Sequence, residues 1–400
     1  MSMLALAGLL CAANVCAHSH RSRSHADDTG SVDGVSVRIR SDRLTLRIVQ
    51  VPQVYIAGPV GPAMLQRVQE LIQAGRIPQG SDVYLDASGG DLASGLTLGR
   101  LFRASSLDTH LGAWRQSRSY QGGVPARPAV CLDACAYAYL GGVFRWMPTG
   151  ADRIGVQAAL LPAMPEPDGK TVAAVARSAA AVPPGTPPVT SMPTPAALRD
   201  YLRAMGIPAS SFARVLTPPQ NGVIWWNPQQ MSAWMVANNG RMPMQVGYQH
   251  LPGAPTLTLS EAVRGGQDRV VIQCTPQGAT LTAYYARSFQ LARQLAAHAT
   301  DSYFLLDWQL WPPRLGDRVQ QQGETLVLQR SLPFAELARV LHAKSLGARI
   351  EVADSVISHG FYIEPALALG RSGSFYADCQ AMQQPVRPEP SASRSGARGK

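Results

Sequence analysis

In the first half of the chain, short apolar runs alternate with stretches of helical periodicity. The apolar runs predict strands at residues 44–50, 54–58, 83–88, 109–114, 144–147 and 153–157. The amphipathic stretches predict helices at 61–75 and 91–105, and residues 129–142 indicate a strand end, a turn and a buried helix. Strand–helix alternation of this kind indicates βαβ units and a mostly parallel sheet, so the expected fold class is α/β.

The second half predicts a different arrangement. Residues 158–195 hold nine prolines and an alanine-rich patch, which predict an exposed, partly disordered insertion in a first domain at 44–240. Helices are expected at 194–206, 209–217 and 227–240. A second, smaller α+β domain is expected at 254–382, with strands at 270–274, 280–285, 303–310, 325–330 and 348–353 and helices at 289–298 and 333–344. Residues 383–400 predict a disordered basic tail.

Residues 1–17 have the pattern of a secretory signal peptide. An apolar stretch is followed by small residues, and Val15 and Ala17 fit the positions that precede a signal-peptidase cut. We therefore expect cleavage before His18 and a periplasmic or secreted bacterial protein. Residues 18–43 are expected to be flexible and basic. Their histidines, at 18, 20 and 25, have no further ligand nearby, so a flexible polar segment is favoured over a metal site.

Basic residues outnumber acidic residues without forming a nucleic-acid-binding pattern. The 400 residues carry 36 Lys and Arg against 26 Asp and Glu, a formal charge of +10. Nearly all of the basic residues are arginines, and they are scattered, with no long run of like charge and no interleaving with aromatic residues. No nucleic-acid partner and no cofactor are expected. No membrane span is expected either, because no segment reaches the roughly 18 uninterrupted apolar residues that one needs.

Four cysteines remain once the signal peptide is removed, a number that suits an oxidising compartment. Cys274 and Cys379 both lie in the second domain, and we predict that they form a disulfide. Cys131 and Cys135 are spaced as i and i+4, and in a regular helix their Cβ atoms would lie about 5–6 Å apart, too far for a disulfide. They can be bridged only if Cys131 is extended and the helix begins near Asp133.

Two motifs of the first domain are candidates for chemistry. A predicted strand runs into Ser88, Gly89 and Gly90, where a tight glycine turn can aim backbone N–H groups at a cleft, as in an oxyanion hole. The stretch from Cys131 to Cys135 opens an alanine-rich helix. The first turn of a helix lies at the positive end of its dipole, where a nucleophile is activated or an anion is stabilised.

The order and spacing of these motifs resemble the Clp-protease/crotonase superfamily, and more narrowly the exported bacterial proteins with that fold. The resemblance covers about residues 45–237 and rests on four motifs in order: DASGGDLASGLTLGRLFR, LDTHLG, CLDACAYAYLGGVFRWM and RIGVQ. It implies a crotonase/Clp-like ββα-spiral domain, self-association, and an oxyanion hole made by Gly89, Gly90 and Ala134. It also implies a nucleophilic serine at position 133 and a histidine at position 157. This chain has Asp133 and Gln157 there.

The two replacements predict a protein without serine-hydrolase activity. Glutamine cannot take the proton of a nucleophile at any accessible pH, and an ionised aspartate attacks amides only weakly. We therefore expect a pseudoenzyme with a binding or scaffolding role, whose ligand is an extended peptide or a protein. Two alternatives remain open: a hydrolase that uses other residues, and carboxylate chemistry through Asp133, as in some crotonase-fold enzymes.

Each candidate side chain also has a structural interpretation. Asp133 could cap its helix by accepting the N–H of Ala136, which is favoured over carboxylate chemistry. A Ser88–His110 dyad would need a group that orients the imidazole, and none is visible, so structural roles are favoured. Core packing is favoured over a peptide or glycan groove for five tryptophans: Trp225, Trp226, Trp234, Trp308 and Trp311.

Overall fold

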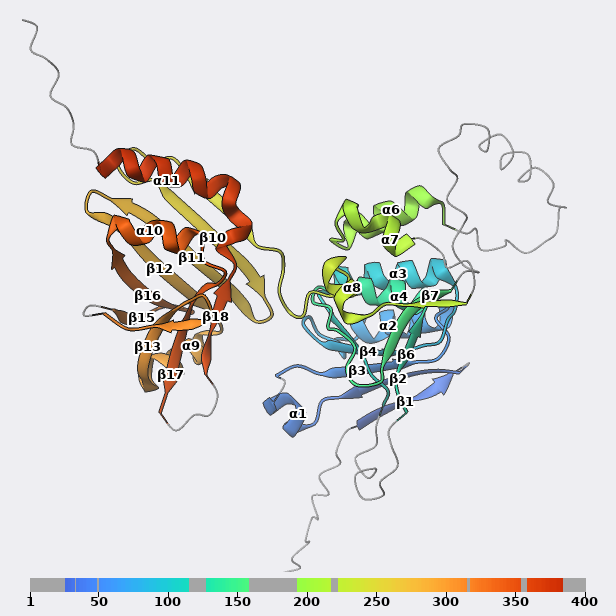
Figure 1. Cartoon of the computed structure of the whole chain (residues 1–400). Coiled ribbons are helices and arrows are strands. Elements are labelled where there is room, and N and C mark those ends of the chain that lie inside the picture. The colour runs from blue at the N-terminus through green and yellow to red at the C-terminus, as the bar shows by residue number, and fades with distance from the viewer. Residues whose placement is uncertain are drawn as a thin grey trace, which may run out of the picture. The chain divides into compact units, whose positions relative to one another are not determined.

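The computed structural model describes residues 26–32, 34–48, 50–114, 127–157, 193–216, 222–314, 317–353 and 358–383. The chain divides into two compact units (Figure 1). The first unit comprises Met1–Val143 and Pro148–Asn227, and the second comprises Phe144–Met147 and Pro228–Lys400. The predicted signal peptide, nearly all of the predicted insertion and the predicted tail lie outside the described residues.

A five-stranded sheet forms the centre of the first unit. Its strands follow the order β1-β2-β3-β4-β5, with bounds Ala26–Val32, Val35–Arg40, Gln53–Ala57, Asp82–Asp86 and Asp108–Leu111. β3, β4 and β5 are parallel, and the predicted helices supply their crossovers as α2 (Pro62–Gln73) and α3 (Leu92–Ala104). β1, β2 and β3 pair antiparallel, so the prediction of a mostly parallel sheet holds only for the part with helical crossovers.

A second, three-stranded sheet completes the first unit. It contains β6 (Val130–Leu132), β7 (Arg153–Gln157) and β8 (Val223–Trp225). β6 is parallel to β7, and a parallel bridge between Ala87 and Cys131 joins this sheet to the end of β4. Three further helices belong to the unit: α4 (Ala134–Leu140), α6 (Pro195–Ala204) and α7 (Phe212–Leu216). The site described below lies where the two sheets meet.

Glycines allow α3 and α4 to pack with their backbones in close contact. A Cβ on Gly95 would lie 2.4 Å from the carbonyl oxygen of Ala134, and a Cβ on Gly141 would lie 2.1 Å from the carbonyl oxygen of Gly99. Every side chain of α4 is buried. The close contact fixes the position of the N-terminus of α4, and therefore of Asp133, relative to the central sheet.

Antiparallel strands make up most of the second unit. A six-stranded sheet has the order β15-β16-β12-β11-β10-β9, with bounds Arg318–Gln322, Thr325–Leu332, Gly278–Ala286, Gly266–Thr275, Thr256–Val263 and Gln245–Gln249. A four-stranded sheet has the order β14-β13-β17-β18, with bounds Gln309–Trp311, Ala299–Leu306, Leu346–Val352 and His359–Ile363. Both sheets contribute to one hydrophobic core together with three helices: α9 (Phe289–His298), α10 (Phe334–Leu341) and α11 (Leu369–Gln383). The helix α8 (Pro228–Ala233) also belongs to this unit.

The predicted disulfide of the second unit is present. Cys274 near the end of β11 and Cys379 on α11 are bonded, with Cα atoms 5.5 Å apart. Both residues are part of the core, and α11 packs against β11 and its neighbours. The bond therefore ties the last helix to the middle of the six-stranded sheet.

Residues 18–43 were expected to be flexible, but 26–32 and 35–40 form the strands β1 and β2, because β2 pairs with both β1 and β3. Four predictions of individual helices and strands are also wrong. Residues 44–50 form the helix α1 (Arg43–Ile48) instead of a strand, because Asp42 caps it by accepting the N–H groups of Leu44 and Thr45, both at 3.0 Å. Residues 144–147 form no strand, because the backbone and guanidinium of Arg145 bond to residues 235–239. The helix predicted at 227–240 ends at Ala233, just before Met235, which has a φ of 57°.

The fourth error is the strand predicted at 303–310. It is broken by a turn at Asp307 and Trp308, whose φ angles are 53° and 64°. The turn separates β13 from β14, which then pair as a hairpin. Among the described residues, no helix is long and apolar enough to cross a membrane.

Candidate functional site

A glycine turn at the end of β4 forms one side of the candidate site. Gly89 and Gly90 have φ angles of 144° and 138°, which favour glycine. The turn pairs with Val60, whose N–H donates to the Gly89 carbonyl at 3.0 Å and whose carbonyl accepts from Asp91 at 2.7 Å. A Cβ on Gly90 would lie 2.1 Å from the Val60 carbonyl oxygen, whereas a Cβ on Gly89 would meet nothing. Within the described part of the chain, the Gly89 N–H has no acceptor.

The junction between β6 and α4 forms the other side. Cys131 is extended in β6, α4 begins at Ala134, and Cys131 and Cys135 form a disulfide with Cα atoms 5.2 Å apart. This disulfide required an extended Cys131 and a helix that begins near Asp133, and the structure has both. Ala87 pairs with Cys131 in parallel register, and the Ala87 carbonyl accepts the N–H of Leu132 at 3.0 Å. The residue that precedes Ser88 and the glycine turn therefore lies next to the β6–α4 junction that contains Asp133.

Asp133 makes a hydrogen bond that the sequence did not predict. Its Oδ1 accepts the backbone N–H of Gln157 at 2.6 Å, and its own N–H donates to the carbonyl of Gly155 at 3.1 Å. The prediction that it accepts the N–H of Ala136 is wrong, because its side chain makes no capping bond. Its φ of 52° turns the carboxylate toward β7 instead. Asp133 and Gln157, which stand where the resemblance implies a serine and a histidine, are thus linked by a hydrogen bond.

The Asp133 carboxyl is a buried acid. The residue is 4% exposed, and burial raises the pKa of Asp133, although the hydrogen bond from Gln157 lowers it in part. Tyr137, one turn further along α4, has its pKa raised by burial and then by the charge of Asp133. A buried carboxyl bonded to a backbone amide holds two segments together, and it is poorly placed to attack a ligand.

His110 lies away from the glycine turn. It is the one described histidine of the first unit, and its Nε2 is 3.1 Å from Oδ1 of Asp82, while its ring stacks on Tyr84 at 4.7 Å. His110 pairs with Tyr84 across β4 and β5, so Ser88 lies four residues further along the strand direction, about 13 Å away. The two residues do not form a dyad, and the structural interpretation of His110 holds.

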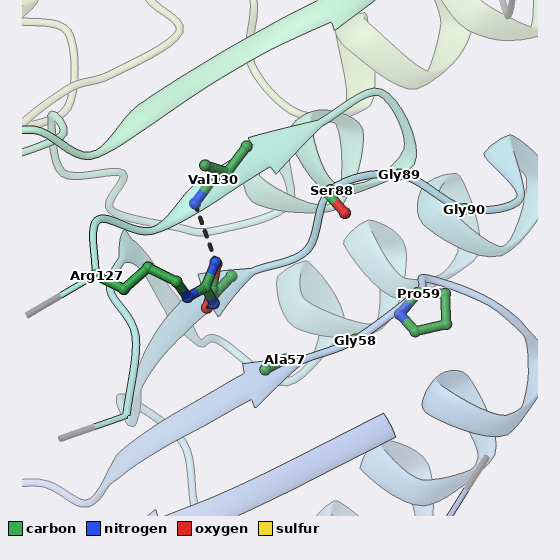
Figure 2. Close-up of a pocket in the computed structure, with 9 residues that line it drawn as sticks. Ala57, Gly58, Pro59, Ser88, Gly89, Gly90, Arg127 and Val130 are labelled. Atoms are coloured by element: carbon green, nitrogen blue, oxygen red, sulfur yellow. Dashed lines mark hydrogen bonds and ion pairs between the residues drawn. The ribbon is translucent and has the colours of Figure 1, made fainter. Parts of the chain in front are cut away.

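A pocket of about 430 Å³ opens beside the glycine turn. Ser88, Gly89 and Gly90 line one side, the segment 57–59 lines another, and Figure 2 shows the Ser88 side chain pointing in the direction of Pro59. Asp86 accepts the N–H of Val130 at 3.1 Å and forms an ion pair with Arg127. Asp133 and Gln157 do not line this pocket.

Sequence reasoning missed the ion pair between Asp86 and Arg127. Asp86 stands at the carboxyl end of a parallel strand, next to a small residue and two glycines, where ligand sites are common. A role for Asp86 in a site could therefore have been predicted from its position in the sequence. Arg127 lies 41 residues further along the chain, and no local pattern marks it.

The five tryptophans are divided between the two units. Trp225 and Trp226 belong to the first unit, and Trp234, Trp308 and Trp311 belong to the second. Trp226 and Trp234 are buried, as core packing predicts. Among the described residues, no three His, Cys, Asp or Glu side chains are grouped as they would be around a metal ion.

Comparisons with known proteins give two kinds of result. No known protein family matches the sequence, and no curated protein is similar to it. The solved structures to which the chain is similar include a mutant of ClpP1 from Listeria monocytogenes, at 10% identity, covering 49% of this chain and 94% of that one with a TM-score of 0.30. They also include a mutant of the membrane-bound stomatin-specific protease 1510-N, at 14% identity, covering 46% of this chain and 75% of that one with a TM-score of 0.29. Both matches leave about half of this chain uncovered.

Proposed function

We propose that the first unit is a Clp-protease-like domain that binds an extended peptide and does not hydrolyse it. The observation that carries the proposal is the hydrogen bond of 2.6 Å from the Gln157 N–H to the Asp133 carboxylate. In a working relay, position 133 attacks and position 157 takes its proton. Here the Asp133 carboxylate accepts a structural hydrogen bond. Gln157 contributes only its backbone N–H to this bond, and its side chain cannot act as a base.

The binding half of the proposal rests on what the domain retains. The glycine turn leaves the Gly89 N–H without an acceptor among the described residues, next to a pocket of about 430 Å³. An N–H at the end of a strand can pair with the carbonyl of an extended peptide, and a neighbouring pocket can take its side chain. Arg127 adds a guanidinium at the rim, since its side chain is 69% exposed.

Fluorescein-labelled casein tests both halves in one experiment with the full chain. Fluorescence anisotropy measures binding, and release of small labelled fragments measures cleavage. We expect saturable binding and no fragments above the rate without protein. Cleavage would overturn the non-catalytic half of the proposal, and an anisotropy that does not change with protein concentration would overturn the binding half.

A matched pair of variants locates the binding to this pocket. Arg127→Gln removes the guanidinium at the rim, and we expect casein binding to weaken several-fold because a charge-assisted hydrogen bond is lost. Arg203→Gln is the control: Arg203 is also an exposed arginine of the first unit, at 67%, paired with Asp200 outside the pocket. Equal loss in both variants would place the binding elsewhere.

A hydrolase with Ser88 as nucleophile is the second candidate, and one observation favours it. Ser88 is exposed and lines the pocket directly before Gly89. A fluorophosphonate probe distinguishes the two functions, because it labels only an activated serine. We expect no labelling of the unmodified chain and none after Asp133→Ser, since Gln157 cannot act as a base. Stoichiometric labelling at Ser88 would replace the proposed function with this one.

We further propose that the protein is exported. Two disulfides among the described residues support an oxidising compartment. N-terminal sequencing of the protein from a periplasmic extract is expected to begin at His18. An intact N-terminus in the cytoplasmic fraction would contradict export.

A further inference from the structure

The pocket beside the glycine turn contains several hydrogen-bond donors that the protein does not use. Among the described residues, neither the N–H of Gly89 nor that of Gly90 has an acceptor, and both residues line the pocket (Figure 2). Arg127 lines it too, and its Nε and Nη1 bond to no described residue. Ser88 adds an exposed hydroxyl. These groups suit a ligand that accepts several hydrogen bonds at one end.

Arg127 is held in place by a buried carboxylate. Asp86 is 6% exposed, and both of its oxygens are used: Oδ1 accepts the Val130 N–H at 3.1 Å, and Oδ2 pairs with Nη2 of Arg127. Asp86 is therefore a positioning residue that fixes the Arg127 fork, whose remaining N–H groups can pair with a planar carboxylate. The ion pair is formally neutral, so an anion would be held here by directed hydrogen bonds and not by an excess of positive charge.

The chain that leads into the glycine turn is already paired on both sides. On one side, Val60 donates its N–H to the Gly89 carbonyl at 3.0 Å and accepts the N–H of Asp91 at 2.7 Å. On the other side, Ala87 pairs with β6. Asp91 then caps α3, so only residues 88–90 remain beside β6 for a ligand. Such a short stretch can pair with about one residue of a peptide, which favours the end of a chain over its middle.

The rest of the pocket is small and apolar. Ala57, Pro59 and Val130 supply its apolar lining, and its volume is about 430 Å³. This volume lies near the lower end of the range for small-molecule sites. It is sufficient for one terminal residue with its carboxylate and an apolar side chain.

We propose that this pocket captures the free C-terminal carboxylate of a polypeptide whose last side chain is apolar. The carboxylate accepts hydrogen bonds from the glycine turn and from Arg127, and the last side chain packs on Ala57, Pro59 and Val130. A terminal carboxylate has about four acceptor sites on its two oxygens, whereas a mid-chain carbonyl has about two. Capture of a C-terminus by backbone N–H groups is an established mode of peptide recognition. The inference rests on the proposed function, because it names the part of the peptide that the site binds.

Three fluorescein-labelled peptides test the chemistry without any mutation. The first is Gly-Ser-Ala-Ala-Ala-Leu with a free C-terminus, and the second is the same peptide as its C-terminal amide. The third is an amide in which one interior alanine is replaced by glutamate, which restores the charge of the first peptide away from the terminus. With the full chain, fluorescence anisotropy is expected to show the free acid binding about tenfold or more tighter than either amide. Equal binding of the acid and either amide would overturn the inference.

Casein binding separates failure of this inference from failure of the proposed function. If casein binds and the acid and amide peptides bind equally, the site binds peptides without selecting their C-terminus, and only this inference is overturned. If neither casein nor any of the three peptides binds, peptide binding itself is overturned, and this inference with it.

Two arginine variants test the location. Arg127→Gln is expected to weaken binding of the free acid by about tenfold or more and binding of the amide by less than about twofold, because only the acid forms the charge-assisted pair. Arg203→Gln, at an arginine that is also exposed but lies outside the pocket, should leave both affinities unchanged. Unchanged binding of the acid in Arg127→Gln, or equal loss of acid and amide there, would show that Arg127 does not hold the carboxylate. Far-UV circular dichroism checks that both variants are folded.

Discussion

Among the described residues, each unit contains one disulfide, and the two bonds close loops of very different length. Cys131 and Cys135 are 4 positions apart, whereas Cys274 and Cys379 are 105 positions apart. The short bond spans the junction of β6 and α4, directly around Asp133. The long bond joins β11 to α11 inside the core of the second unit.

The difference teaches that the same covalent bond can shape a site or stabilise a fold. Disulfides act largely by restricting the unfolded chain, and the restriction grows with loop length, from about 2 kcal/mol for a loop of a few residues to about 4.7 kcal/mol for about 100. The long bond is therefore expected to dominate stability. The short bond gives less stability, but it holds Asp133 in the conformation with a φ of 52° that directs its carboxylate to Gln157.

The largest expected effect is removal of the long bond. Cys274→Ala with Cys379→Ala should lower the free energy of unfolding by up to about 4.7 kcal/mol, the chain-entropy limit for a loop of this length. Alanine avoids burying a hydroxyl, since both positions are buried. Urea unfolding of the full chain, followed by far-UV circular dichroism, measures the change. A loss below about 1 kcal/mol would mean that the bond does not restrict the unfolded chain as expected.

The next largest effect is expected from replacing a glycine in the turn at the end of β4. Gly90→Ala should cost about 3 kcal/mol, because alanine is strained at a φ of 138° and its Cβ would meet the Val60 backbone. Gly89→Ala is the matched control, since its φ of 144° imposes strain but its Cβ meets nothing. We expect about 1–2 kcal/mol there. Equal destabilisation of both variants in urea would show that the contact with Val60 is not what requires glycine.

Sequence reasoning succeeded where the determining interactions are local. α2, α3 and α9 lie within two residues of their predicted bounds, because Pro62, Asp91 and Ser288 mark their first turns. α1 was predicted as a strand because its alternating apolar residues outweighed the cap at Asp42.

The candidate site was predictable in position but not in detail. The motifs point to the glycine turn and to Asp133, but the bond from Gln157 to Asp133 depends on the parallel pairing of β6 with β7. Arg127 and Asp86 are likewise brought together by long-range pairing, with Ala87 after β4 bridged to Cys131 in β6. No local pattern encodes such contacts, because they arise only when the sheets assemble.

A smaller effect on stability, but a larger effect on the site, is expected from removal of the short bond. Cys131→Ala with Cys135→Ala should lower the free energy of unfolding by about 2 kcal/mol, the chain-entropy value for so short a loop. Casein binding should weaken as the β6–α4 junction loosens. The comparison fails if this variant is destabilised as strongly as the variant without the long bond, or if it keeps full binding.

The smallest effect concerns the charge of Asp133. Its pKa is raised in the folded protein by burial, above the ordinary value of 3.8. A raised pKa in the folded state means that the folded protein binds this proton more tightly than the unfolded chain does. Protonation of Asp133 therefore stabilises the folded protein fully below the unfolded-state pKa, and this contribution is lost as pH rises through the folded-state pKa. Asp133→Asn keeps an oxygen for the Gln157 N–H and removes the titration. We therefore expect the stability of the Asn variant relative to the unmodified protein to rise as pH increases from about 4, and then to level off.

Asp133→Ala separates the charge of this residue from its hydrogen bond. It removes the titration as well, but it leaves the Gln157 N–H without its acceptor, which costs about 1–3 kcal/mol at every pH. Between pH 4 and pH 8, the urea midpoints of the two variants should therefore change with pH in the same way. The midpoint of Asp133→Ala should be lower than that of Asp133→Asn at every pH. Coinciding curves would mean that the bond to Gln157 contributes nothing, and position 133 would then hold a carboxylate free for chemistry. If the urea midpoints of Asp133→Asn change with pH in parallel with those of the unmodified protein, then burial does not raise the pKa of the Asp133 carboxyl. Either outcome would remove the physical basis for treating Asp133 as the structural replacement of a nucleophile.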